Sequence, residues 1–238
     1  MPDPLYFEKI GNQFDEFMSD YDVSRRIELI FKHLFPCDQR RFERVLEVGC
    51  GTGRISEFLV DYTPDLTVSD ISERLCQTVA ERFRCSFRVT NACALAFESS
   101  QFDLVVSSEC IEHTADPLKA IDEMCRVVRP GGYLILTTPN PVWYPVLWLS
   151  EMLKIRRFEG SEWWVWPREA RRHLVGNGFI DIFFGGCHMA PWQVPGSKKV
   201  LPWFDQFGER LYPLMINYGF RARKVEGSPL QKAHEQVL

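Results

Sequence analysis

The sequence predicts an α/β fold built on a seven-stranded, mostly parallel sheet with helices on both faces. Two observations carry this prediction. Short apolar runs alternate with segments of helical periodicity between residues 44 and 140, and a glycine-rich segment separates the first apolar run from the first helical one. Parallel strands need long crossover connections, usually helical and right-handed, so this rhythm indicates successive βαβ units.

Periodicity and helix-boundary signals place the individual elements. Strands are expected at residues 44–49, 66–70, 86–90, 102–108, 133–139, 179–186 and 218–225. Helices are expected at residues 5–20, 22–31, 55–62, 73–83, 117–128 and 167–178. The expected N-caps are Asp22, Ser72 and Asp116, and the last of these helices is expected to end at Gly178. Two aromatic-rich segments, 139–166 and 187–217, interrupt the rhythm and are expected to be irregular.

Length indicates one domain, because 238 residues suit a single α/β core with added segments. We expect an N-terminal helical cap at residues 1–43 and a ligand-binding core at 44–140. Insertions on the substrate side and the sixth strand follow at 141–217. The last strand and a polar tail occupy residues 218–238.

Charge and cysteine spacing argue against several classes of protein. The net charge is −4 and no run of Lys or Arg exceeds a pair, so nucleic acid is not an expected partner. The eight cysteines contain no C-x-x-C pair, and no apolar run approaches the roughly 18 residues of a membrane span. The first residues lack a basic region followed by an apolar stretch, so we expect no signal peptide and a cytoplasmic location.

The segment VLEVGCGTGR, from Val45 to Arg54, is the most informative part of the chain. It follows an expected buried strand and opens an expected helix, which is the context in which a glycine motif indicates a ligand. Its third glycine, Gly53, comes one residue earlier than in the dinucleotide motif, a spacing that suits a carboxylate-bearing nucleoside better than a pyrophosphate. Seventeen residues later Asp70 ends the second strand, where a carboxylate can bind both ribose hydroxyls. Capping of the next helix is the alternative role for Asp70.

Four motifs follow one another along the chain: VLEVGCGTG, TVSDIS, FDLVVSSECIEHTADP and RVVRPGGYLILTTPN. In this order they resemble the class I S-adenosyl-L-methionine (SAM)-dependent methyltransferases, whose fold is Rossmann-like. More narrowly, the chain is similar to the branch that contains the ubiquinone-biosynthesis O-methyltransferases and many natural-product enzymes. The resemblance is close over residues 44–140 and loose elsewhere. It implies an enzyme that binds SAM, releases S-adenosyl-L-homocysteine and methylates a small-molecule acceptor.

The resemblance also implies which residues bind the cofactor. Glu47 and the loop residues Gly49, Cys50, Gly51 and Gly53 would hold the methionine part of SAM.

Three further segments complete the implied cofactor site. Asp70 would bind the ribose and Ile71 would pack on the adenine. The family usually carries an Asp after the third strand, where this chain has Asn91 followed by Ala92. The amide oxygen of Asn91 can still accept a hydrogen bond from the adenine amino group.

The end of the fourth strand, including Ser108 and Glu109, would pass close to the methionine chain. A basic residue of the preceding helix, Arg25 or Arg26, is expected to reach the SAM carboxylate. Exposure on a solvated helix face is the alternative for both arginines.

Methyl transfer from a sulfonium is an in-line displacement that needs alignment, exclusion of water and often removal of a proton. His113 follows the fourth strand and is the first candidate for the general base, since an unperturbed pKa of about 6.5 suits this task. A structural role in the loop before Asp116 is its alternative. His188, after the sixth strand, is the second candidate, and Asn140 is a candidate for orienting an acceptor hydroxyl. No cluster of Asp, Asn and Glu stands out as a magnesium site, so no metal is expected.

The insertion after the fifth strand concentrates six aromatic residues: Trp143, Tyr144, Trp148, Trp163, Trp164 and Trp166. Aromatic walls suit a phenolic, lipid-like or sugar acceptor. Packing of an added helix or a homodimer surface is the second interpretation, so a monomer and a homodimer both fit. Peripheral contact with a membrane through residues 142–157, which contain Lys154, Arg156 and Arg157, is the third.

Two other functional classes are weighed against a methyltransferase. A Rossmann oxidoreductase is disfavoured by the early third glycine and by the lack of a Tyr-x-x-x-Lys pair. A non-catalytic scaffold or regulatory protein of this fold would usually lose the glycine loop or the ribose carboxylate, and this chain keeps both. The sequence therefore predicts a SAM-dependent methyltransferase of a small molecule, with a hydroxyl oxygen as the favoured target and N- or C-methylation as the alternative.

Overall fold

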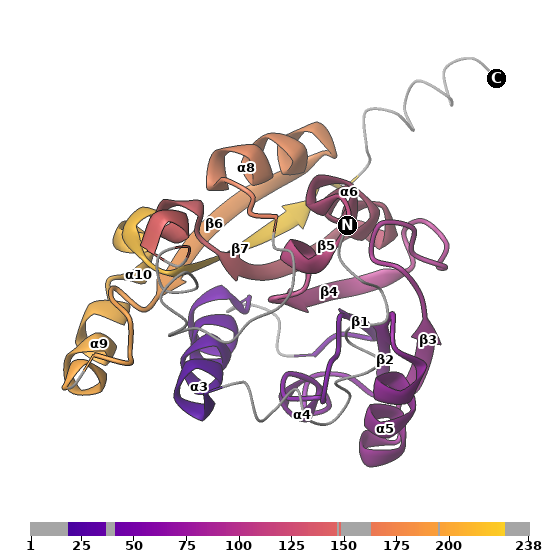
Figure 1. Cartoon of the computed structure of the whole chain (residues 1–238). Helices are drawn as coiled ribbons and strands as arrows, with labels where there is room; N and C mark the ends of the chain where they lie inside the picture. The colour runs from indigo at the N-terminus through magenta and orange to yellow at the C-terminus, as the bar shows by residue number, and fades with distance from the viewer. Residues whose placement is uncertain (1–18, 37–40, 147, 149–162, 195, 227–238) are drawn as a thin grey trace.

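The computed structural model describes residues 19–36, 41–146, 148, 163–194 and 196–226. Within them seven strands form one sheet in the spatial order β3-β2-β1-β4-β5-β7-β6 (Figure 1). The strands are β1 (Arg44–Val48), β2 (Asp65–Asp70), β3 (Ser86–Val89), β4 (Phe102–Ser108), β5 (Val128–Pro139), β6 (Phe179–Cys187) and β7 (Asn217–Lys224). The first five strands pair in parallel, whereas β7 runs antiparallel to both β5 and β6. The expected seven-stranded, mostly parallel sheet is confirmed.

Helices connect the strands and cover both faces of the sheet. They are α3 (Asp20–Glu28), the π-helical η2 (Leu29–Leu34), α4 (Ser56–Leu59), α5 (Glu73–Phe83), η3 (Ile111–His113), α6 (Pro117–Val127), η4 (Pro141–Trp143), α8 (Pro167–Gly176), α9 (Ser197–Asp205), α10 (Gly208–Leu211) and η5 (Tyr212–Leu214). In Figure 1, α6 and α8 lie on one side of the sheet, and α3, α4 and α5 lie on the other.

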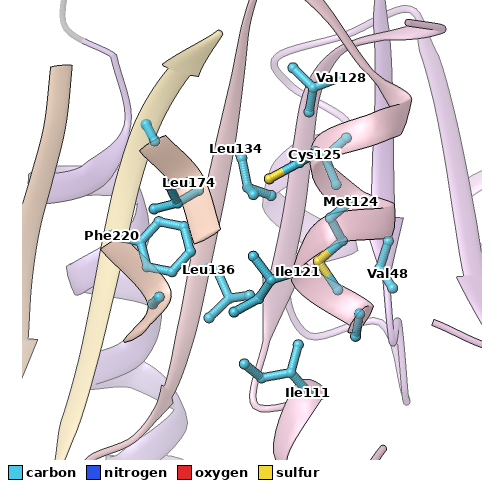
Figure 2. Close-up of a cluster of buried hydrophobic side chains, with 14 of the residues drawn as sticks. Val48, Ile111, Ile121, Met124, Cys125, Val128, Leu134, Leu136, Leu174 and Phe220 are labelled. Atoms are coloured by element: carbon cyan, nitrogen blue, oxygen red, sulfur yellow. The ribbon is translucent and has the colours of Figure 1, made fainter. Parts of the chain in front are cut away.

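One apolar core lies between the sheet and the helices α6 and α8 (Figure 2). Leu134 and Leu136 of β5 and Phe220 of β7 share this core with Ile121 of α6 and Leu174 of α8, and all five side chains are fully buried. Burial of a side chain of this size contributes about 1.5–3 kcal/mol. This core therefore anchors α6 and α8 to the sheet.

A second core lies on the opposite face of the sheet. Leu34 of η2 and Val79 of α5 pack there with Val45 of β1 and Leu104 of β4. Because side chains alternate along a strand, Val45 belongs to this core while the next residue, Leu46, belongs to the first. The second core thus ties the N-terminal helical segment to the centre of the sheet.

The strand register brings the candidate site residues to one edge of the sheet. Val48 of β1 lies opposite Ser69 of β2 and Ser107 of β4, so these three strands end at the same level. Since β7 is antiparallel, its first residue, Asn217, pairs with Cys187 at the end of β6. The loops after β1, β2, β4 and β6 and the start of β7 therefore share this carboxyl edge.

Two of the three expected N-caps are confirmed. The Ser72 hydroxyl accepts a hydrogen bond from the backbone of Leu75, and the Asp116 carboxylate accepts one from Lys119. Asp22 is not an N-cap, because α3 begins at Asp20 with Ser19 before it. Its carboxylate bonds instead to side chains of the carboxyl edge, described below.

Other boundaries also differ from expectation. The helix expected at 55–62 contains only the α-helical turn α4, and the C-cap of α8 is Asn177 rather than Gly178. Segment 187–217, expected to be irregular, contains α9, α10 and η5. Pro202 lies inside α9 and obscures its helical signal in the sequence. The helix expected at 5–20 lies outside the described residues.

Leu174→Ala is expected to lower the free energy of unfolding by about 2–5 kcal/mol, because the buried side chain would leave a cavity. Val175, its neighbour in α8, is 58% exposed, so Val175→Ala should change that free energy by less than about 0.5 kcal/mol. Urea unfolding of both variants measures the difference. Equal losses in the two variants would contradict the orientation of α8 on the sheet.

Candidate functional site

The glycine loop after β1 is held against the end of β2 by main-chain hydrogen bonds. The N–H groups of Gly49 and Cys50 both donate to the Ser69 carbonyl, at 2.8 and 3.0 Å. Gly49, Gly51 and Gly53 have φ values of 76°, 49° and 84°, which side chains other than glycine rarely adopt. The loop sequence is therefore required by the turn itself, as expected.

The three glycines serve different purposes. A methyl group at Gly49 would come within 2.5 Å of the Cys110 sulfur, and one at Gly53 within 2.9 Å of the Phe83 ring. Packing against these neighbours therefore leaves no room for a side chain at either position. A methyl group at Gly51 would meet nothing within 4 Å, so the backbone there is open to an approaching ligand.

Asp70 lies beside this open backbone. Its Oδ2 accepts a hydrogen bond from the Gly51 N–H at 3.1 Å, and its Oδ1 accepts one from the Ser72 N–H at 3.0 Å. Burial raises the pKa of Asp70, and these N–H groups oppose the shift. Asp70 and the glycine loop are thus brought together, as the sequence predicts, and the capping role of the next helix belongs to Ser72.

Glu47 lies beneath the loop and is buried. The Ser56 hydroxyl donates to its Oε2, and the Ser69 hydroxyl donates to its backbone carbonyl at 3.0 Å. Burial raises the pKa of Glu47 to about 8. A neighbouring positive charge would favour the ionised form of such a carboxyl group. The acidic pair of Glu47 and Asp70 therefore fits a ligand that brings positive charge and hydroxyl donors to the loop.

The segment after β3 lies next to Asp70. The Thr90 N–H donates to the Asp70 carbonyl at 3.0 Å, which brings Asn91 and Ala92 to the same edge. The Asn91 Oδ1 accepts a hydrogen bond from the Cys93 N–H at 2.8 Å. Ile71, expected to face a base, is 40% exposed beside Asp70. An apolar surface thus adjoins the carboxylate.

The ends of β4 and β5 carry a second group of polar residues. The Ser108 hydroxyl lies 2.9 Å from that of Thr137, and the Glu109 N–H donates to the Thr137 carbonyl. Glu109 has φ +50°, a left-handed conformation, and its Oε2 accepts a hydrogen bond from Asn217 Nδ2 at 2.7 Å. The start of β7 thereby contacts the end of β4.

Helix α3 adds charged side chains to this group. Arg26 is buried and donates to Asp22 Oδ2 at 2.8 Å. Although its burial opposes the charged form, Asp22 and Glu109 hold the pKa of Arg26 above its usual value. Arg25 instead pairs with Asp205 of α9 and with Glu28, so Arg26 is the arginine of the two that faces the carboxyl edge.

The two histidine candidates have different surroundings. His188 is fully buried after β6, with its Nε2 2.9 Å from Asp22 Oδ1. Its backbone N–H donates to Asp205 Oδ1 at 2.9 Å. His113 ends η3 and is half-buried. The preceding residue, Glu112, is buried and accepts a hydrogen bond from Thr138.

Asn140, expected to orient an acceptor, has both ends of its amide occupied. Its Nδ2 donates to the Tyr212 carbonyl at 2.9 Å and its Oδ1 accepts from Val142. It therefore has a clear structural role in holding η4 and η5 together.

Sequence reasoning missed three residues of the polar group: Asp22, which carries the local signal of an N-cap, Asp205 and Asn217. Asp205 and Asn217 belong to no motif. Among the described residues no group of three or more His, Cys, Asp or Glu side chains is placed to hold a metal ion. Nor does the described part of the chain contain a helix long and apolar enough to span a membrane.

A family model described as a methyltransferase domain matches residues 46–136, from the middle of β1 to β5. Ubiquinone biosynthesis O-methyltransferase from Parvibaculum lavamentivorans is 33% identical over 108 residues, covering 42% of this chain and 43% of the relative. Its counterpart from Coxiella burnetii is 29% identical over 72% of this chain and 69% of the relative. An uncharacterized methyltransferase from Schizosaccharomyces pombe is 29% identical over 56% of this chain and 51% of the relative. The match thus spans about half of the length of the Schizosaccharomyces pombe relative and less than half of that from Parvibaculum lavamentivorans.

Solved structures share the fold. A SAM-dependent methyltransferase from Thermotoga maritima, a possible histamine N-methyltransferase, superposes with a TM-score of 0.68 at 17% identity over 92% of this chain and 98% of its own. The N-methyltransferase NodS from Bradyrhizobium japonicum, solved with S-adenosyl-L-homocysteine, gives 0.57 at 18% identity over 87% and 89%. The chain thus carries a methyltransferase domain at residues 46–136 and is similar to ubiquinone-biosynthesis O-methyltransferases and to solved SAM-dependent methyltransferases.

Proposed function

We propose that this chain transfers the methyl group of SAM to a hydroxyl oxygen of a small-molecule acceptor. The open backbone of Gly51 beside the Asp70 carboxylate is the observation that carries this proposal. It is a place where a nucleoside can approach the main chain and meet a carboxylate at hydrogen-bonding distance. The match to a methyltransferase domain, and a structural neighbour solved with S-adenosyl-L-homocysteine, support SAM as that nucleoside.

The cofactor is proposed to lie along the carboxyl edge from β1 to β4. Asp70 would accept hydrogen bonds from the ribose hydroxyls through the remaining lone pairs of its carboxylate, beside its present bonds to the Gly51 and Ser72 N–H groups. Ile71, Asn91 and Ala92 adjoin the adenine, and the partial exposure of Ile71 suits that contact.

The methionine part is proposed to lie over the loop residues Gly49, Cys50, Gly51 and Gly53 and the buried Glu47. Ionised Glu47 would attract the positively charged end of this part. Because burial raises its pKa to about 8, the Glu47 carboxyl group can stay protonated until the cofactor binds. Ser108, Glu109 and Arg26 face the same part from β4 and α3, with Arg26 paired to its carboxylate.

Bound SAM supplies an electrophilic methyl group on a positively charged sulfur. An acceptor oxygen would take this methyl group in line, with the carbon–sulfur bonding pair left on sulfur, so the protein would have to align the acceptor and receive its proton. The hydroxyl proton passes to His113, which follows β4 at the level where the methyl group is expected. His188 is the second candidate for this proton, but its Nε2 is engaged by Asp22. The preference for oxygen rests on the similarity to O-methyltransferases.

Asp70→Ala is expected to weaken binding of S-adenosyl-L-homocysteine about 10- to 150-fold, because a carboxylate hydrogen bond to buried hydroxyls contributes about 1.5–3 kcal/mol. Asp65→Ala is the matched control: it lies at the exposed start of the same strand and should bind like wild type. Isothermal titration calorimetry of the three proteins measures the affinities. Unchanged affinity in Asp70→Ala would remove this residue from the proposed site.

Gly51→Ala is expected to reduce cofactor affinity more than stability. Its φ of +49° strains an alanine by about 1–3 kcal/mol, yet no protein atom obstructs the methyl group. Gly178 has φ +78° with nothing within 4 Å and lies after α8, so Gly178→Ala carries similar strain without facing a ligand. Both variants should lose comparable thermal stability, and only Gly51→Ala should lose calorimetric affinity. Equal cofactor affinity in the two would mean that Gly51 does not face the ligand.

His113→Ala is expected to slow methyl transfer about a hundredfold without changing cofactor affinity, if its imidazole removes the acceptor proton. The wild type is first screened with SAM labelled with carbon-13 in the methyl group and a panel of phenols, sugars and lipid-like alcohols. NMR then distinguishes O-methyl from N-methyl and C-methyl products. His173→Ala is the control, because His173 lies on α8 and bonds to Asp122.

A rate for His113→Ala within a few-fold of wild type would assign His113 a structural role. Products methylated only at nitrogen or carbon would overturn the proposed oxygen specificity while leaving the cofactor site intact. A folded protein that binds neither SAM nor S-adenosyl-L-homocysteine would overturn the enzymatic proposal as a whole.

A further inference from the structure

Two buried polar atoms at the carboxyl edge have no hydrogen-bond partner in the described part of the chain. They are Oδ1 of Asn217, whose residue is 5% exposed, and Nδ1 of His188, whose residue is fully buried. An unsatisfied buried polar atom is costly, so such atoms in a native protein usually meet a ligand or an ordered water. The two residues lie next to each other in the sheet, at the start of β7 and directly after β6.

Carboxylates fix which way both side chains face. Glu109 accepts a hydrogen bond from Asn217, and a carboxylate can pair only with the Nδ2 end of the amide, so Oδ1 must point away from Glu109. Asp22 lies 2.9 Å from His188 Nε2 in the same way, which leaves Nδ1 on the other side of the ring. The orientation of the Asn217 amide therefore follows from its hydrogen bond to Glu109.

The two side chains belong to one stretch of the edge. Asn217 pairs with Cys187, the residue before His188, and the Ile216 N–H donates to the His188 carbonyl at 2.8 Å. Two residues further along β7, a methyl group at Gly219 would approach Leu34 of η2 within 2.8 Å. Since side chains alternate along a strand, Asn217 faces the same side of the sheet as α3 and η2.

Backbone conformation marks the same place. Glu109 and His188 both have left-handed φ values, +50° and +62°, and each directly follows a strand of the carboxyl edge. Such strain in residues other than glycine persists only where the surroundings impose it, and it concentrates at functional sites. The rings of Tyr21 and Trp192 lie 5.8 and 4.7 Å from the His188 ring and give the site an aromatic border.

We propose that Asn217 determines acceptor specificity: its Oδ1, together with Nδ1 of His188 on the adjoining segment of the chain, accepts hydrogen bonds from donor groups of the acceptor. An amide oxygen can only accept, so the preferred acceptors carry hydroxyl groups rather than ethers in this position. Carboxylate-bearing acceptors are disfavoured, because Glu109 and Asp22 lie directly behind the two side chains. This inference rests on the proposed function and assigns the acceptor end of that site.

The test compares two probes of similar shape, catechol and 1,2-dimethoxybenzene, which differ in donor groups. NMR titrations of the wild type, with and without S-adenosyl-L-homocysteine, are expected to show catechol binding about fivefold or more tightly. Asn217→Ala should bind both probes with equal affinity. Asn217→Leu, which keeps the branched shape of the side chain, repeats the test should the alanine variant be unfolded.

Asn140→Ala is the matched control, because Asn140 is equally buried at the same edge but has both amide ends occupied. It should lower the melting temperature and keep the preference for catechol. Two results would overturn the proposal: a wild type that does not prefer catechol, including one that binds neither probe, or Asn217 variants that keep the preference. The latter would mean that Oδ1 holds an internal water only. Calorimetry with S-adenosyl-L-homocysteine alone tests the proposed function separately: absence of binding there would overturn the cofactor site, whatever the probes show.

Discussion

Hydrogen bonding of β1 between β2 and β4 determines where the candidate site forms. The loop that leaves β1 turns at once, because its N–H groups meet the carbonyl of Ser69 in the neighbouring strand. On the other side of β1, the Ser107 hydroxyl donates to the Val48 carbonyl at 2.9 Å. Neither the loop after β1 nor the end of β4 can shift without breaking these hydrogen bonds at the centre of the sheet. The open backbone at Gly51, the carboxylate of Asp70 and the end of β4 are therefore parts of one rigid frame.

The features that could be predicted from the sequence have local causes. The alternation of apolar runs and helical segments predicts the strands, and the caps Ser72 and Asp116 act within one turn of their own helices. The glycine loop is equally local, since its three positive φ values follow from the turn itself. For the same reason the cofactor end of the site could be proposed residue by residue from the strand ends.

The pairings within the polar group could not be predicted, although His188 and Glu109 were each named from the sequence, because these contacts join distant parts of the chain. The Asp22–His188 bond spans 166 positions and the Asn217–Glu109 bond spans 108. Asp22 carries the local signal of a helix cap, yet its tertiary partners decide its role. Asn217 opens a strand and carries no motif. Only the antiparallel insertion of β7 between β5 and β6 brings it to the carboxyl edge.

The assembly of this polar group has a consequence for how enzymes of this architecture can be recombined. The matched domain covers residues 46–136. Asp22 and Arg25 lie before this domain, and their partners His188 and Asp205 lie after it. A chimera that exchanged only the C-terminal third between two relatives would separate buried charges from their counterparts, which is strongly destabilising. The segments before and after the matched domain thus contribute to one buried cluster of paired side chains. A substitution in one of these segments is expected to require a matching change in the other.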